Sequence, residues 1–172
     1  MVLIPTKGRS RGPEAAGPVR RPDFADTSPS RRRNMAAVRG TDTQPELKIR
    51  RLLHRLGYRF RIHARELPGR PDVVFRSRRK AIFVNGCFWH FHQCASSVIP
   101  KTRREWWEDK LRRTVERDGL NIRQLGELGW EVLTIWECSL KDETALNAKL
   151  IDFLGQARLD LSRATAKTWH GK

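Results

Sequence analysis

The sequence predicts one α/β domain built around a mixed β-sheet. Segments with helical periodicity and segments rich in β-branched and aromatic residues follow one another in the order helix, strands, helices, strand, helix. The length, 172 residues, suits one domain plus a tail. We expect a disordered basic tail over residues 1–34, the folded domain over residues 35–158, and a flexible C-terminal tail over residues 159–172.

The N-terminal tail is predicted from its composition. Residues 1–34 contain five of the nine prolines and three glycines, and they show neither helical nor strand periodicity. They carry eight basic and three acidic side chains, a net charge of +5, so the remaining residues carry +11. We also consider Met35 as an alternative start of the chain, which the sequence alone does not settle.

The first helix is expected over residues 43–56. Thr43 and Glu46 form the pattern of a capping box, in which two side chains bind the free amides at a helix start. Gly57 fits the position just beyond the helix end. The apolar stripe of this helix comprises Leu47, Leu52, Leu53 and Leu56.

A β-hairpin is expected next. A short strand over residues 58–61 precedes turn residues at 67–71, and then two β-rich runs, 72–75 and 81–84, flank a basic turn. If the hairpin is centred on Arg78, Asp72 lies opposite Val84.

The second half of the domain is predicted as helix, helix, strand, helix. A basic, aromatic helix is expected from Thr102, its N-cap, to Asp118, with Trp107, Leu111 and Val115 on its apolar face. A further short helix ends at Gly129. A strand over residues 130–136 and a last helix over residues 142–154 complete the domain.

The net positive charge of the chain indicates a nucleic-acid partner. Lysine and arginine number 35 against 19 acidic residues, a formal net charge of +16, which is typical of nucleic-acid-binding proteins. No apolar stretch suggests export or membrane insertion, and three cysteines are an odd number for a disulfide framework. We expect a cytoplasmic protein with reduced thiols that does not bind membranes.

Cysteine and histidine are concentrated in one short segment. Cys87, His92 and Cys94 supply the thiolate and imidazole ligands that Zn²⁺ prefers, and Cys138 is the only other cysteine available to complete a tetrahedral site. Buried cysteines also occur simply as small hydrophobic residues, so the spacing alone leaves both interpretations open.

A second metal site is suggested by the hairpin. The Asp72 carboxylate and the main-chain carbonyl of Val84 are placed to share a hard cation such as Mg²⁺. His90, six residues downstream, is close enough to activate water. Asp72 alone also fits a strand-start residue after proline.

Three motifs carry a resemblance to a known family. They are Leu67-Pro68-Gly69-Arg70-Pro71-Asp72, Phe83-Val84-Asn85-Gly86-Cys87-Phe88-Trp89-His90, and Leu128-Gly129-Trp130 to Trp136-Glu137-Cys138. They resemble the very-short-patch repair endonucleases, and the resemblance covers nearly the whole chain after Met35. This resemblance implies a restriction-endonuclease-like core with a structural zinc site. It also implies a bacterial enzyme that nicks DNA 5′ to the thymine of T:G mismatches arising from deaminated 5-methylcytosine.

The resemblance also implies roles for single residues. Asp72 and the Val84 carbonyl would hold catalytic Mg²⁺, His90 would be the general base, and Glu46 would support the metal-bound waters or the histidine. Glu46 fits the capping box equally well. Asn85 stands where some members have a second active-site histidine, so it can hold a phosphate or water but cannot act as a base. The structural zinc ligands would be Cys87, His92, Cys94 and Cys138.

Aromatic residues would read the mismatch. In the family the positions of Phe88, Trp89 and Trp107 insert between base pairs, where imperfect pairing lowers the cost of unstacking. For Trp107 this expectation replaces the core position that periodicity predicts. We expect a monomer acting on mismatched double-stranded DNA at the nucleoid. The alternatives are a catalytically inert, zinc-stapled DNA-binding module and an endonuclease with another mismatch specificity.

Overall fold

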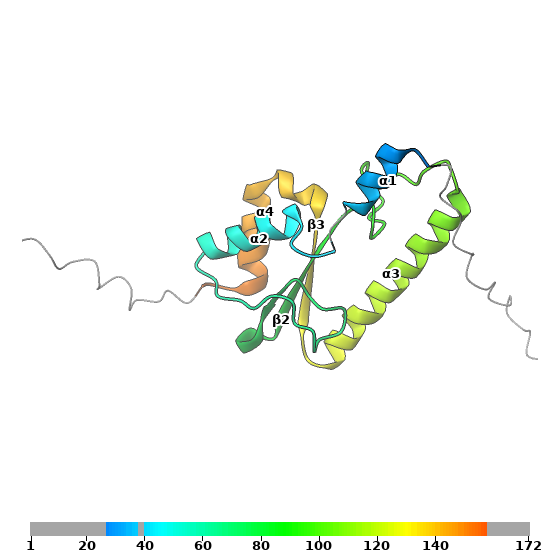
Figure 1. Cartoon of the computed structure of the whole chain (residues 1–172). Coiled ribbons are helices and arrows are strands. Elements are labelled where there is room, and N and C mark those ends of the chain that lie inside the picture. Colours follow the sequence, from blue (N-terminus) through cyan, green and yellow to red (C-terminus); the bar gives the residue numbers. More distant parts are fainter. Residues whose placement is uncertain (1–26, 38–39, 158–172) are drawn as a thin grey trace, which may run out of the picture.

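The computed structural model describes residues 27–37 and 40–157 and shows a three-stranded sheet with helices on both sides (Figure 1). In the strand order β1-β2-β3, β1 pairs antiparallel with β2, and β2 pairs parallel with β3. The predicted α/β domain with a mixed sheet is confirmed. Its elements are α1 (Pro29–Ala36), α2 (Gln44–Arg55), β1 (Val73–Phe75), η1 (Arg76–Arg78), β2 (Lys80–Asn85), α3 (Arg104–Glu127), β3 (Glu131–Trp136), η2 (Glu137–Lys141) and α4 (Glu143–Leu154).

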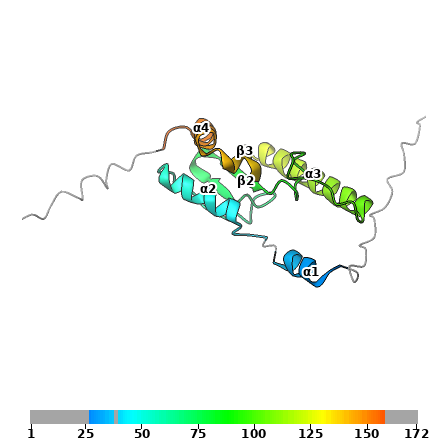
Figure 2. The ribbon, with the colours of Figure 1, turned by 90° about the horizontal axis from the view of Figure 1, so that it is seen from above.

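The main hydrophobic core lies on the face of the sheet that α2 and α4 cover, whereas α3 runs along the other side (Figures 1 and 2). Alternation along β2 directs Ile82 and Val84 into this core, and Phe83 and Asn85 toward α3. One face of β2 is therefore packed in the core, and the other face borders a pocket. The buried helix residues of the core are Ile49, Leu52, Leu53, Leu146, Leu150 and Leu154.

The start of α2 confirms the capping box. The backbone N–H of Glu46 donates to Thr43 Oγ1, and the Glu46 carboxylate accepts from the backbone N–H of Thr43. Gly57 follows the helix with φ +81°, a conformation that favours glycine. Ile49, which the predicted apolar stripe omitted, is fully buried.

The hairpin forms with a register that differs from the prediction by one residue. Val73 pairs with Ile82, and Phe75 pairs with Lys80. Four residues, rather than an odd number centred on Arg78, connect the strands, and the last of them, Arg79, has φ +51°. Asp72 is therefore not directly opposite Val84. The strand expected over residues 58–61 is reduced to a single bridge between Arg61 and Val74.

Helix α3 is continuous where two helices were expected. Its 24 residues run through Gly119, and it begins after Arg103 in a left-handed conformation rather than at the predicted N-cap Thr102. Trp107 and Leu111 are buried, but Val115 is 44% exposed, contrary to the expected apolar face. The predicted strand before η2 and the last helix are confirmed as β3 and α4.

The expected disordered tail overlaps a short helix. Residues 29–34 belong to α1, which has no apolar stripe, while residues 1–26 and the expected C-terminal tail from residue 159 lie outside the described residues. Within the described ranges, none of the helices combines the length and the apolarity needed to cross a bilayer.

Basic side chains between β1 and β2, and at the start of β2, donate hydrogen bonds to carbonyls at the ends of α3 and α4. Arg78 donates to the carbonyls of Leu154 and Gln156, and Lys80 Nζ lies 2.6 Å from the Phe153 carbonyl, all at the C-terminus of α4. Arg79 donates to the Leu128 carbonyl beyond α3 at 3.0 Å. These cations satisfy carbonyls that have no partner within their own helices. Part of the positive charge is therefore structural.

We predict that Arg78→Ala lowers the free energy of unfolding by about 1 to 2 kcal/mol, because two carbonyls lose a charged donor. Urea denaturation measures this loss. Arg59→Ala is the matched control, because Arg59 is exposed and its side chain has no partner among the described residues. Unchanged stability together with weaker DNA binding would instead assign Arg78 to the DNA-binding surface.

Candidate active site and metal centre

Asp72 immediately precedes β1, and its carboxylate is bound to β2. Asp72 Oδ2 accepts a hydrogen bond from the Val84 backbone N–H at 2.7 Å. Burial raises the pKa of Asp72 to about 6; the Val84 N–H opposes this rise, and the negative charge of Glu46 adds to it. The predicted neighbourhood of Asp72 and Val84 is present despite the shifted register, because the side chain spans the offset.

The Val84 carbonyl is on the same edge of β2 as its N–H, since both groups of a strand residue point to one side. Extending the observed hairpin register brings Val84 opposite Pro71. Proline has no N–H to donate, so the ladder offers this carbonyl no partner there. A carboxylate with a raised pKa beside such a carbonyl is a pair of oxygen ligands suited to a hard cation.

Glu46 is buried at the start of α2, near Asp72. In addition to its capping contacts, its carboxylate accepts from Arg50 at 2.8 Å and from the Asp42 backbone N–H at 3.0 Å. Arg50 is itself buried and also binds Asp42 at 2.5 Å, while His63 Nε2 lies 3.4 Å from the same Asp42 oxygen. The capping role of Glu46 is thus present, and its orientation is fixed by a buried guanidinium.

His90 is paired with an acid that sequence reasoning missed. Its Nδ1 lies 2.5 Å from Asp118 Oδ2 on α3. Burial opposes ionisation of Asp118, but His90 and Arg117 together hold the pKa of Asp118 below its usual value. One signal existed in the sequence: Asp118 is seven residues from both Leu111 and Leu125, so it is a polar residue within a buried stripe.

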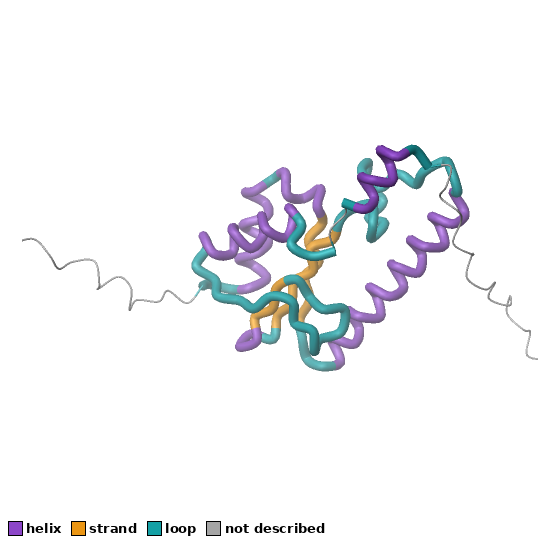
Figure 3. The backbone as a smooth tube through the Cα atoms, in the orientation of Figure 1, coloured by secondary structure: helices purple, strands orange, loops and turns teal. Residues whose placement is uncertain are grey.

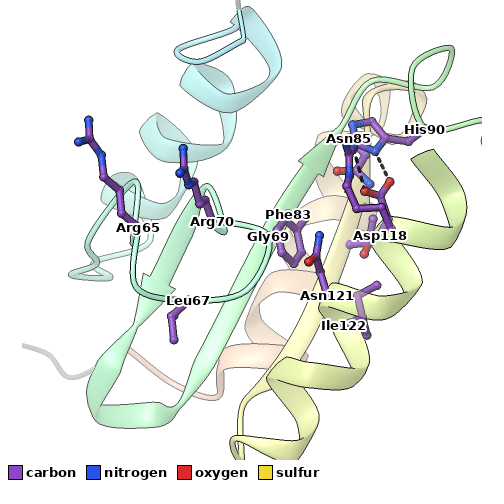
Figure 4. A pocket seen from close by; sticks show the side chains of 12 residues that line it. Arg65, Leu67, Gly69, Arg70, Phe83, Asn85, His90, Asp118, Asn121 and Ile122 are labelled. Carbon is purple, nitrogen blue, oxygen red and sulfur yellow. Dashed lines mark hydrogen bonds and ion pairs between the residues drawn. The ribbon is translucent and has the colours of Figure 1, made fainter. Parts of the chain in front are cut away.

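The expected catalytic residues line one cleft of about 1140 Å³. A second hollow of about 510 Å³, here called the α3 pocket, lies between α3 and the open face of the sheet (Figure 4). Asn85, only 9% exposed at the end of β2, and His90 border both hollows. The cleft is lined by Glu46, Asp72, Val84, Asn85, Trp89 and His90, among others.

The four expected zinc ligands also come together. One ligand atom from each of Cys87, His92, Cys94 and Cys138 lies within 4.8 Å of the others. Cys138 Sγ is 3.4 Å and Cys87 Sγ 3.8 Å from His92 Nδ1. The His92 ring is stacked on Trp136, with centroids 4.2 Å apart. Three sulfurs and one imidazole nitrogen at this spacing match a closed tetrahedral metal site.

The thiols of this cluster differ in environment. Burial raises the pKa of Cys87 to about 11, whereas the Ser96 backbone N–H lowers the pKa of Cys94 to about 6. A bound cation would favour the thiolate at each sulfur. The cluster can therefore hold a metal ion that links the segment after β2 to the segment after β3.

The three expected mismatch-reading residues form an aromatic cluster with Trp106. Phe88 meets Trp89 and Trp107 with ring centroids 5.1 and 5.2 Å apart, and Trp106 meets Trp107 at 4.8 Å. Lys110 Nζ lies 4.9 to 5.4 Å from the three indole rings. Trp107 is only 8% exposed, in agreement with the inward position that periodicity predicts. Its proposed contact with DNA remains a prediction.

Comparisons with known proteins identify the family. A family model described as DNA mismatch endonuclease Vsr matches residues 23–96. The DNA mismatch endonuclease Vsr of Escherichia coli is 44% identical over 117 residues, covering 68% of this chain and 75% of that protein. The type II nicking enzyme V.NmeAIP of Neisseria meningitidis is 33% identical over 116 residues, covering 67% and 83%.

The alignment with a further relative covers almost the whole length of that relative. The type II nicking enzyme V.XorIIP of Xanthomonas oryzae pv. oryzae is 47% identical over 128 residues, which make up 74% of this chain and 94% of the relative. A fold is retained at this level of identity over such a length. The chain therefore belongs to the Vsr family of DNA mismatch endonucleases and is a DNA endonuclease, a hydrolase of phosphodiester bonds.

Proposed function

We propose that the protein nicks double-stranded DNA 5′ to the thymine of T:G mismatches that arise from deaminated 5-methylcytosine, by Mg²⁺-dependent hydrolysis. It would act as a monomer with a restriction-endonuclease-like core, at the nucleoid in the bacterial cytoplasm. The observation that carries the proposal is that Asp72, Val84 and His90 face one cleft together with Trp89. In this proposal, hydrolysis of the DNA strand and recognition of the mismatch would take place in the same cleft.

Asp72 and Val84 would hold the Mg²⁺. The fit rests on the raised pKa of the Asp72 carboxyl and on the Val84 carbonyl that faces Pro71. When bound, the cation would neutralise charge on the phosphodiester and make its coordinated water more acidic. The protein's part is to keep both oxygens on one edge of β2, where the hairpin fixes them.

His90 would accept the proton of the attacking water. Because Nδ1 donates to Asp118, Nε2 is left as the acceptor, and the ring orientation is fixed by α3. Asp118 is thus a positioning residue that sets the tautomer of His90.

Glu46 and Asn85 would hold water and phosphate rather than transfer protons. Arg50 and the capping contacts fix the Glu46 carboxylate at the cleft, so it can orient metal-bound waters without moving. The Asn85 amide has a donor and an acceptor, which suits an unesterified phosphate oxygen or a water molecule.

Phe88, Trp89 and Trp107 would read the mismatch by inserting among the base pairs. Edge-to-face contacts of Phe88 with Trp89 and Trp107 join the segment after β2 to α3 in one apolar group. A wobble pair is easier to unstack than a matched pair, so a rigid wedge favours it. Trp89, which is half-buried and lines the cleft, is best placed to reach a base near the scissile bond.

The Cys/His cluster would bind Zn²⁺ with a structural role. All four ligands come from protein side chains, which leaves no open position for a substrate. The ion would fasten Cys87, Cys94 and His92, and thereby the aromatic cluster, to Cys138 after β3.

We predict that Asp72→Asn abolishes nicking of a T:G duplex while binding to that duplex is retained, because a cation ligand is lost. Wild-type protein should nick T:G and spare other mismatches in a panel, and only with Mg²⁺. Equal nicking of several mismatches would contradict the specificity, and Mg²⁺-dependent nicking by Asp72→Asn would contradict the site.

The same variant should be more stable than the wild type in Mg²⁺-free buffer. Because the folded-state pKa of Asp72 lies above the ordinary value of 3.8, ionisation of Asp72 destabilises the folded protein as pH rises through about 6. Asp72→Asn should gain about 1 to 3 kcal/mol at pH 7.5. The gain should vanish below pH 4, where Asp72 is protonated in both states.

We predict that His90→Ala slows nicking by about 10²-fold or more. Asp118→Asn should lower kcat by about 10- to 100-fold with KM for DNA unchanged, because Asp118 orients His90 and touches no substrate. Asp118→Glu should recover part of kcat. Single-turnover nicking kinetics measure all three, and an effect of Asp118→Asn on KM alone would contradict the positioning role.

We predict about one zinc per chain, lost together with on the order of 3 kcal/mol or more of stability in Cys138→Ser. Elemental analysis and thermal unfolding measure the two losses. Asp72→Asn is the control and should retain its zinc. A wild-type protein without zinc would contradict the metal assignment, as would a Cys138→Ser variant that kept both zinc and stability.

A further inference from the structure

Two arginines at the edge of the cleft have no side-chain partner among the described residues. Arg65 and Arg70 are exposed, line both the cleft and the α3 pocket, and take part in no ion pair. Several other arginines are paired with acids: Arg50 with Asp42 and Glu46, and Arg112 with acids of its own helix. The charge of Arg65 and Arg70 is thus available to a ligand in the cleft.

The loop that carries both arginines is fixed in place. It belongs to the long connection between α2 and β1, drawn in teal in Figure 3. Two successive turns close it, from Leu67 N–H to the Ala64 carbonyl at 3.2 Å and from Arg70 N–H to the Leu67 carbonyl at 3.0 Å. The Arg65 and Arg70 side chains project from it in the same direction (Figure 4).

Gly69 allows this loop to approach α3 closely, because it has no side chain. A Cβ at Gly69 would lie 2.8 Å from the Asn121 side chain, and both Gly69 and Arg70 have positive φ, +71° and +52°. A non-glycine residue in the left-handed region carries strain that the surroundings must hold. The position of Arg70 at the edge of the cleft therefore requires a left-handed backbone at both Gly69 and Arg70.

The cleft itself requires added positive charge to receive DNA. Its wall contains the acids Asp42, Glu46, Asp72 and Glu137, which repel a phosphodiester backbone. Arg50 supplies one positive charge to Asp42 and Glu46, so this cation and one divalent ion together still do not offset all four acids. Arg65 and Arg70 are the cations of this lining that have no partner in the described part of the chain, and guanidinium groups suit phosphate oxygens.

We propose that Arg65 and Arg70 bind backbone phosphates of the nicked strand, on the side of the scissile phosphate away from Phe88, Trp89 and Trp107. The strand would run from the aromatic cluster, over Asp72 and His90, to this arginine pair. Two contacts on opposite sides hold the scissile phosphate in register with the reactive groups. The assignment of sides rests on the proposed roles of Asp72 and the aromatic residues.

The test is a salt titration of DNA binding without Mg²⁺. Arg65→Ala and Arg70→Ala should each reduce the slope of log K against log salt by about 1, equally on T:G and matched duplexes. Arg70→Lys should keep the slope, because its charge remains. Arg51→Ala, an exposed arginine on α2 outside both hollows, is the matched control. Zinc content and thermal unfolding verify that each variant folds.

Methylphosphonate substitution of single phosphates in the nicked strand then locates the contact. Wild-type binding should weaken at one or two positions on the side away from the mismatch, and Arg70→Ala should be insensitive there. Slopes equal to that of Arg51→Ala, or sensitivity only on the mismatch side, would overturn the proposal. Because binding is measured without Mg²⁺ on matched and mismatched DNA, a failure of the proposed T:G specificity or metal chemistry would be seen separately.

Discussion

The parallel pairing of β2 with β3 is the constraint on which both the cleft and the metal centre depend. The ladder runs from Lys80 opposite Glu131 to Asn85 opposite Trp136, so both strands end at the same edge of the sheet. Cys87 and Cys138 each follow two residues beyond these paired ends, and they meet for that reason. A shift of this pairing by one residue would turn every side chain of β3 to the other face and separate the cysteines.

The basic side chains of this protein have different roles: some bind helix carbonyls, some pair with acids, and a few have no partner among the described residues. The cations of the β1–β2 turn bind carbonyls at the ends of α3 and α4, and Arg50 neutralises acids beside the cleft. Helix α3 carries several arginines, but acids one turn away pair with many of them. Net charge therefore overstates the surface that is free to meet DNA, and the unpaired cations at the edge of the cleft matter more than their number suggests.

Local chemistry made much of the fold and site predictable. The capping box of α2 and the strand character of residues 130–136 depend on residue types that have few alternative uses. The four residues of the Cys/His cluster, in contrast, were expected from the family resemblance, because their spacing alone left two interpretations open. The nearness of Asp72 to Val84 was also predictable, although the register was not, because turn length decided it and a carboxylate tolerates a one-residue offset.

Other features depend on tertiary structure alone. The sequence marks Asp118 as a polar residue within the apolar stripe of α3, but its pairing with His90, 28 positions away, depends on how α3 packs. The continuity of α3 through Gly119 was missed because glycine weakens a helix by only about 1 kcal/mol, which a long helix tolerates. Periodicity predicted the inward position of Trp107, but its contact with Phe88 depends on how the segment after β2 packs against α3.

The continuity of α3 has a consequence for where the enzyme cuts. Trp107 in the aromatic cluster and Asp118 beside His90 belong to one uninterrupted helix, about 16 Å apart along its axis. With the roles proposed above, this helix would fix the spacing between Trp107 at the mismatch and Asp118, which orients His90. One residue inserted between these two positions would rotate one end of the helix relative to the other by about 100°. The position of the nick relative to the mismatch would then depend on the pitch of this one helix.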